Sequence, residues 1–159
     1  MTTTDLTLKL VFDRWYASIK SCDTLLANLT DEILQKEIAP GKNRGIYLLG
    51  HLIAVHDDML ILLDMGEKLY PELNEPFIKL ADSVSTPMPS IADLRAYWAK
   101  QNDVLKQKFE NLKSEEWFEK HTAVSEEDFA KEPSRNKLNI IITRTSHLQY
   151  HIGQLVLLK

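Results

Sequence analysis

Two of the five histidines in this chain have a spacing that suits metal binding: His147 and His151 stand four residues apart. They lie in a segment with helical periodicity, so both imidazoles are expected on one face of the helix, one turn apart. That separation allows two side chains to bind one metal ion, although a structural metal site normally needs further ligands. A metal-free pair of histidines, hydrogen-bonded within the core, is therefore an alternative that spacing alone leaves open.

A third imidazole could come from an earlier apolar segment. His51 borders its apolar face, beside Leu48 and Val55. His56 lies about 140° farther around the same helix, so we expect it to be a surface or packing residue. Asp58 lies close to His51 in angle, and three roles stay open for it: a fourth ligand, an acceptor that orients an imidazole, or a solvated boundary residue. Of these, the acceptor and the boundary residue are favoured.

The elements that must position these side chains are helices. Apolar residues recur at spacings of three and four in four long segments, which predicts amphipathic helices. The segments span residues 5–29, 43–65, 90–112 and 136–158. Sustained strand-type alternation and internal repeats are missing. We therefore predict an all-α fold, a four-helix bundle that forms a single domain over residues 1–159.

Residues with strong positional preferences mark the helix ends. Asn43 can cap the second helix, and Gly66 is suited to a left-handed stop after it. The run from Ser90 to Asp93 resembles a capping box at the start of the third helix. The long connections should carry short helical turns at residues 30–33 and 114–117.

Composition limits the classes of function. The chain has 159 residues with 44% hydrophobic and 26% charged residues, which is typical of one globular domain. Its net charge of −4 gives no basic surface for nucleic acid or an anionic membrane. The single cysteine, Cys22, excludes a disulfide framework and paired-cysteine zinc sites, and its place on an apolar face predicts a buried thiol. We see no signal peptide or membrane span and expect a cytoplasmic protein.

Several catalytic motifs are absent. No glutamate stands three residues before a histidine, so the Glu-x-x-His signature of di-iron bundles is missing. The His-Glu-x-x-His, Gly-x-Ser-x-Gly and phosphate-loop motifs are also missing. The histidines are therefore the groups on which a functional hypothesis must rest.

Two segments resemble the motifs of the DinB-like superfamily. The first is GHLIAV at residues 50–55, and the second is SHLQYHIGQL at residues 146–155. The family's H-x-x-x-H is followed by a small residue, glutamine and an apolar run, which residues 151–156 match. Length, helical layout and motif order agree as well, so the resemblance covers nearly the whole chain.

The resemblance implies an up-down-down-up four-helix bundle, often homodimeric, that holds a divalent metal ion with three histidines. In this sequence those are His51, His147 and His151. Zinc or nickel is the favoured ion, and iron or copper also suits three imidazoles. Three protein ligands would leave coordination positions open for water or substrate.

Relatives in the superfamily include transferases that use low-molecular-weight thiols, which implies a metal-dependent thiol S-transferase or a hydrolase acting on a small molecule. Whether the protein is an enzyme stays open. One alternative is a non-catalytic, stress-related metal-binding or dimerising protein, and another is a metal-free polar histidine network. Arg144, three residues before His147, could receive an anionic substrate group or pair with a neighbouring helix. Gln154 could support His151.

Overall fold

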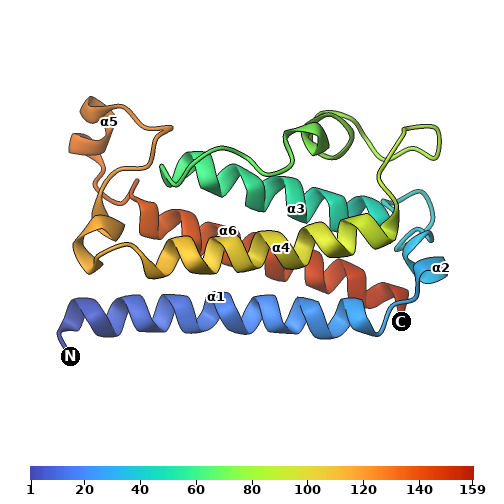
Figure 1. Ribbon diagram of the computed structural model, residues 1–159, viewed down its shortest axis with the longest axis horizontal. Helices are drawn as coiled ribbons and strands as arrows, with labels where there is room; N and C mark the ends of the chain where they lie inside the picture. The colour runs from blue at the N-terminus through green and yellow to red at the C-terminus, as the bar shows by residue number, and fades with distance from the viewer.

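The structure is a computed structural model that describes residues 1–159, and its regular elements are all helical. Four long helices form the bundle (Figure 1): α1 (Thr3–Ala27), α3 (Gly45–Leu62), α4 (Ile91–Glu110) and α6 (Lys137–Leu155). The connections hold short elements: α2 (Asp31–Leu34), η1 (Pro71–Leu73), η2 (Glu75–Lys79), η3 (Ser114–Phe118), α5 (Glu126–Lys131) and η4 (Val156–Leu158). The predicted all-α four-helix fold is confirmed.

The bundle has up-down-down-up topology. In Figure 1, α1 and α6 run in one direction, and α3 and α4 run in the opposite direction. The helices pack in the pairs α1–α6, α3–α4 and α3–α6. Because α3 and α4 are parallel, the chain must return along the bundle between them, and η1 and η2 pack on α3 during this crossover. The crossover therefore brings distant backbone close to α3.

Two predicted ends of α3 are wrong. The helix begins at Gly45, not at Asn43, because the Asn43 carbonyl accepts the Ile38 N–H in the preceding turn. It ends at Leu62, and the left-handed residue that follows is Asp64, with φ of 59°. Aspartate tolerates this conformation better than most residues do. Gly66, the predicted stop, lies two residues later with φ of 126°.

The other terminal signals are confirmed. Ser90 caps α4 by accepting the Asp93 N–H at 3.0 Å. Thr30 caps α2 in the same way through the Ile33 N–H, and η3 begins at Ser114 as expected. We did not predict α5, η1 or η2, because three to six residues are too few to show helical periodicity.

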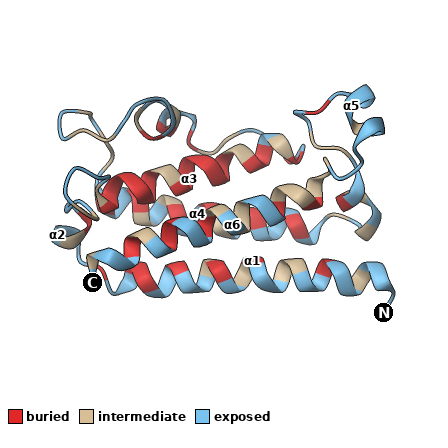
Figure 2. Cartoon of the chain, turned by 180° about the vertical axis from the view of Figure 1, so that it is seen from behind, coloured by how far each residue is buried: buried red, intermediate tan, exposed pale blue.

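The core surrounds α3, of which 14 of 18 residues are buried (Figure 2). By length and a mean hydropathy of 1.4 this helix could cross a membrane, but most of it is buried inside the bundle. Such burial is typical of the central helix of a folded domain, so α3 is weak evidence for a membrane span. Cys22 is fully buried as predicted, and burial raises the pKa of its thiol to about 12, which keeps it unreactive.

The buried apolar residues form two clusters along the bundle. One includes Leu48, Leu52 and Leu148, and the other includes Met59 and Ile141. On both α3 and α6, the residues between the two clusters include polar side chains. The candidate site lies next to this interruption of the apolar core.

Candidate metal centre

Three histidines converge between α3 and α6. His51 lies in the second turn of α3, and His147 and His151 lie one turn apart on α6. The helices α3 and α6 are packed against each other in antiparallel directions, and the three histidines lie where the two helices meet. The potential ligand atoms of the three residues all lie within 4.8 Å of one another. The structure thus brings together the three histidines that the family resemblance implies.

The distances between the ring nitrogens fit one shared ion. The His147 Nε2 atom lies 3.0 Å from His151 Nε2 and 3.3 Å from His51 Nε2. An ion held by imidazoles at about 2.0–2.1 Å, with bond angles of about 90–109°, would separate the nitrogens by about 2.9–3.4 Å. Both of these separations fall in this range, and the His51 and His151 ligand atoms lie within 4.8 Å of each other, so the donor set is one that a first-row divalent metal binds.

Hydrogen bonds outside the triad fix the tautomers of two rings. The His51 Nδ1–H donates to the backbone carbonyl of Phe77 at 2.8 Å, and the His151 Nδ1–H donates to Gln154 Oε1 at 2.7 Å. Their Nε2 atoms therefore carry lone pairs, and both point at His147 Nε2. One proton on His147 can satisfy only one of them. A cation bound by all three nitrogens would satisfy every lone pair.

Burial favours the neutral form of the two imidazoles on α6. Burial, together with the neighbouring His151, His51 and Arg144, lowers the pKa of His147 to about 4. The pKa of His151 is also lowered by burial. Metal binding requires neutral imidazole, so His147 and His151 are in the binding form at neutral pH without loss of a proton.

A glycine makes the hydrogen bond to His51 possible. A Cβ atom on Gly50 would lie 2.3 Å from ring atoms of Phe77, so only glycine allows η2 to pack this closely on α3. Tyr47 stacks near His51, with ring centroids 6.3 Å apart, and donates its hydroxyl to the Leu80 carbonyl at 2.8 Å. We did not predict the part played by Phe77. The signal that could have indicated it is a glycine inside an apolar helix.

The remaining candidate residues have different environments. Gln154 contacts His151 as expected. Arg144 has a buried Nε without a partner and forms no ion pair, so the predicted alternative of pairing with a neighbouring helix is not observed. Asp58 pairs with Lys68, its side chain is 31% exposed, and it does not belong to the converging group. His56 is fully buried, which confirms packing and not a surface position.

Comparison with known proteins places this fold in a family. The family model of the DinB superfamily matches residues 14–155. The structure is similar to the crystal structure of a conserved protein from Enterococcus faecalis, with a TM-score of 0.64 and 17% identity over 98% of this chain and 94% of that chain. That likeness concerns the fold. No curated protein matches the sequence.

With most of its length matched, the chain belongs to the DinB superfamily, a metal-associated family of helical bundles. The three converging histidines lie on the segments whose motifs carry the family resemblance.

Proposed function

We propose that this protein is a metal-dependent enzyme of the thiol S-transferase or hydrolase type, acting on a small molecule. His51, His147 and His151 would hold the divalent ion, zinc or nickel in preference to iron or copper. The observation that carries the proposal is the convergence of three Nε2 atoms, with two opposite ring nitrogens already bonded to Phe77 and Gln154. Because one proton on His147 can satisfy only one of the two Nε2 lone pairs, a cation shared by the three rings would supply the partner that the other lacks.

The three imidazoles would occupy three coordination positions and leave others open. The ion would supply Lewis acidity, which lowers the pKa of a thiol or water that reaches an open position. His51 and His147 are partly exposed, so a small molecule can approach the triad from solvent. Membership of a superfamily that includes thiol transferases favours a thiol over water as the activated group.

Arg144 would bind an anionic group of the substrate. It lies one turn before His147 on α6, and no carboxylate of the chain lies within ion-pair distance of its guanidinium. Burial lowers the pKa of Arg144, with Asp58 acting in the opposite direction. A substrate carboxylate would supply the partner that this half-buried cation lacks.

The proposed activity also implies a small-molecule partner and a cytoplasmic location. The partner is a small molecule, and the net charge of −4 argues against nucleic acid. A cytoplasmic location would supply low-molecular-weight thiols in reduced form. The homodimer that is common in the family belongs to this proposal too.

A panel of cellular thiols tests the activity. Untagged protein loaded with zinc or nickel is incubated with each thiol and an electrophilic reporter, beside His147→Ala treated in the same way. We expect thiol-dependent turnover that the variant lacks. Hydrolysis of the reporter without thiol would select the hydrolase, and bound metal with no turnover under either condition would support a non-catalytic metal-binding role.

Arg144 is tested with paired reporters that differ only in a carboxylate. We expect Arg144→Met to raise KM for the anionic reporter by roughly 10- to 100-fold, as loss of a charge-assisted hydrogen bond would. The neutral reporter and the Arg144→Lys variant serve as controls. An equal change for both reporters would contradict an anion-binding role.

A further inference from the structure

Polar side chains interrupt the core between its two apolar clusters. His56 comes from α3, Gln101 and Asn102 come from α4, and Arg144 and His147 come from α6. We call these five residues the polar layer. Its apolar walls include Trp15 and Trp98, whose rings lie 5.0 and 5.3 Å from that of His56, measured between centroids.

Every member of the polar layer has a buried polar atom without a hydrogen-bond partner in the chain. His56 is fully buried and has no partner for either ring nitrogen, and Asn102 has none for either amide atom. The Arg144 Nε, the Gln101 Oε1 and the His147 Nδ1 are unpartnered as well. Buried polar groups are bonded in the great majority of cases, so this concentration in one layer indicates a polar ligand that the chain does not itself supply.

Among the three candidate metal ligands, only His147 lacks a protein partner for its Nδ1 atom. His51 and His151 each have a protein acceptor for their Nδ1–H, namely the Phe77 carbonyl and Gln154. His147 has none, and its Nδ1 is buried. Histidines that bind metals almost always donate this second N–H to a carboxylate, a carbonyl or a water molecule. With a metal ion on its Nε2, His147 would carry its proton on Nδ1 and would need an acceptor from outside the chain.

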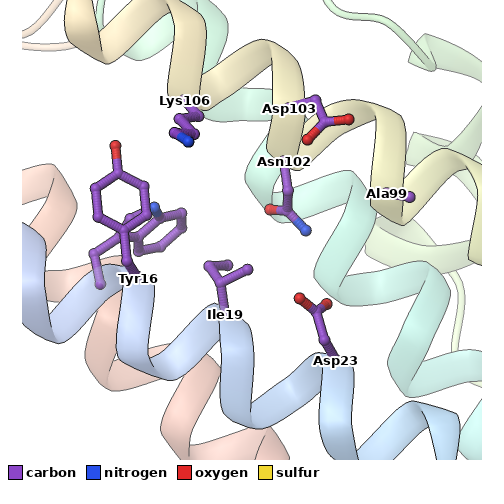
Figure 3. Close-up of a pocket in the computed structure, with 8 residues that line it drawn as sticks. Tyr16, Ile19, Asp23, Ala99, Asn102, Asp103 and Lys106 are labelled. Atoms are coloured by element: carbon purple, nitrogen blue, oxygen red, sulfur yellow. The ribbon is translucent and has the colours of Figure 1, made fainter.

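A surface cleft lies next to the polar layer. A cleft of about 270 Å³ lies between α1 and α4, and Asn102 and Trp15 line it. Figure 3 shows the Asn102 amide pointing into this cleft, toward Asp23 on α1. Behind it, Asn102 acts on His56 as a hydrogen-bonding neighbour without reaching full hydrogen-bond geometry. Two polar groups that lie this close and do not bond each other can both bond the same water molecule.

We propose that the polar layer holds ordered water admitted from the α1–α4 cleft, and that one water accepts the Nδ1–H of His147 while His56 and Asn102 hold it in place. His56 and Asn102 are then positioning residues for the third metal ligand. Water fits better than an ion, because the layer offers both donors and acceptors, and a buried water makes about three hydrogen bonds. The inference rests on the proposed metal site.

Metal binding without turnover tests this inference. Wild type, His56→Phe, His56→Gln and Asn102→Leu are titrated with Co²⁺ against a chelator, and the visible spectrum of each complex is recorded. We expect His56→Phe and Asn102→Leu to weaken affinity by roughly 10- to 100-fold and to alter the spectrum, because His147 loses its outer support. His56→Gln, which can still bond water, should restore most of the affinity.

The control is Ile53→Val, a fully buried change on α3 outside the polar layer. It should lower the unfolding midpoint without changing the Co²⁺ affinity or the spectrum. Unchanged affinity and spectrum in folded His56→Phe and Asn102→Leu would overturn the inference while leaving the metal site intact. If wild type itself bound no Co²⁺, the proposed function would fail instead.

A crystal structure at high resolution provides a test that does not depend on the variants. We expect ordered water within hydrogen-bond distance of His147 Nδ1 and of His56, continuous with water beside Asn102. A dry layer, or a protein atom that has moved to accept the His147 N–H, would contradict the proposal.

Discussion

At the scale of single residues, the site depends on which nitrogen of each imidazole carries the proton. Phe77 and Gln154 hold the Nδ1–H of His51 and His151, so the Nε2 lone pairs face the centre of the triad. The two-histidine spacing on α6 predicted a shared face, the position of His51 at the border of an apolar face made it a candidate third imidazole, and the family motif favoured that choice. The Phe77 carbonyl could not be predicted, because a backbone acceptor in a crossover of 28 residues leaves no pattern in residue types.

His56 shows a second limit of sequence reasoning. Its angle on the helix placed it away from His51, which is correct, but the surroundings of that face depend on α1 and α4. Packing of two tryptophans around a histidine is a tertiary property, and helical periodicity carries no information about it.

The buried histidines make stability depend on pH. Burial lowers the pKa of His56 to about 3 and that of His147 to about 4, whereas the unfolded chain takes up these protons near 6.5. Their effect on stability is therefore absent above pH 6.5, and it becomes a penalty as pH falls toward 4. We expect the free energy of unfolding of the metal-free protein to decrease from pH 7 to pH 4.

The variant His56→Phe isolates one contribution to this decrease. The substitution removes the His56 imidazole, whose pKa is lowered to about 3, and leaves the carboxylates unchanged. The free energy of unfolding of the variant should therefore fall less steeply between pH 6.5 and 4. Urea denaturation of both proteins at matched pH values measures the difference. Equal slopes would show that His56 does not stay neutral in the folded state.

At the scale of elements, the most specific contact is the packing of η2 on α3 at Gly50. The four helices could be predicted because each carries an apolar stripe, and Ser90 and Thr30 mark starts that the structure confirms. The short elements α5, η1 and η2 could not, because their conformations depend on what they pack against. Asp57, fully buried, shows this dependence: its carboxylate accepts the N–H groups of Leu69 and Tyr70 and fixes the path of the crossover.

Replacement of two glycines tests the role of this contact. Gly50→Ala places a Cβ atom against the Phe77 ring, so we expect overpacking to cost about 1–3 kcal/mol and metal affinity to fall by about tenfold as His51 loses its acceptor. Gly153→Ala is the matched control, because nothing lies within 4 Å of its Cβ position. There, helix propensity should raise stability by up to about 1 kcal/mol, with affinity unchanged.

Thermal unfolding and metal titration of both variants measure these effects. A Gly50→Ala protein with wild-type stability and affinity would mean that η2 can move away from α3 without loss. The close approach would then have no bearing on the site.

At the scale of the whole molecule, the up-down-down-up order makes α3 and α4 parallel and so requires the crossover that supports His51. This order came from the family resemblance and not from the helical pattern, since amphipathic stripes do not state which helices are neighbours. The outer surface of α1 and α6 leaves apolar side chains exposed, including Leu10 at 59% and Ile142 at 46%, which line one shallow hollow.

The expected homodimer can be tested on this surface. We predict that wild type has about twice the 18.3 kDa chain mass in light scattering and that Leu10→Glu combined with Ile142→Glu shifts it to the monomer. Val84→Glu is the control, because Val84 is 86% exposed in the crossover. If the wild-type protein were a monomer, the expected homodimer would be wrong. If the double variant stayed dimeric, the interface would lie on another surface.

We propose that the three imidazoles together hold one metal ion. Anomalous scattering from crystals of untagged protein grown in metal-replete medium, measured on both sides of the zinc and nickel absorption edges, tests it directly. We expect one strong peak about 2.0–2.1 Å from the Nε2 atoms of His51, His147 and His151. The absence of any anomalous peak between these three atoms would contradict a shared metal ion.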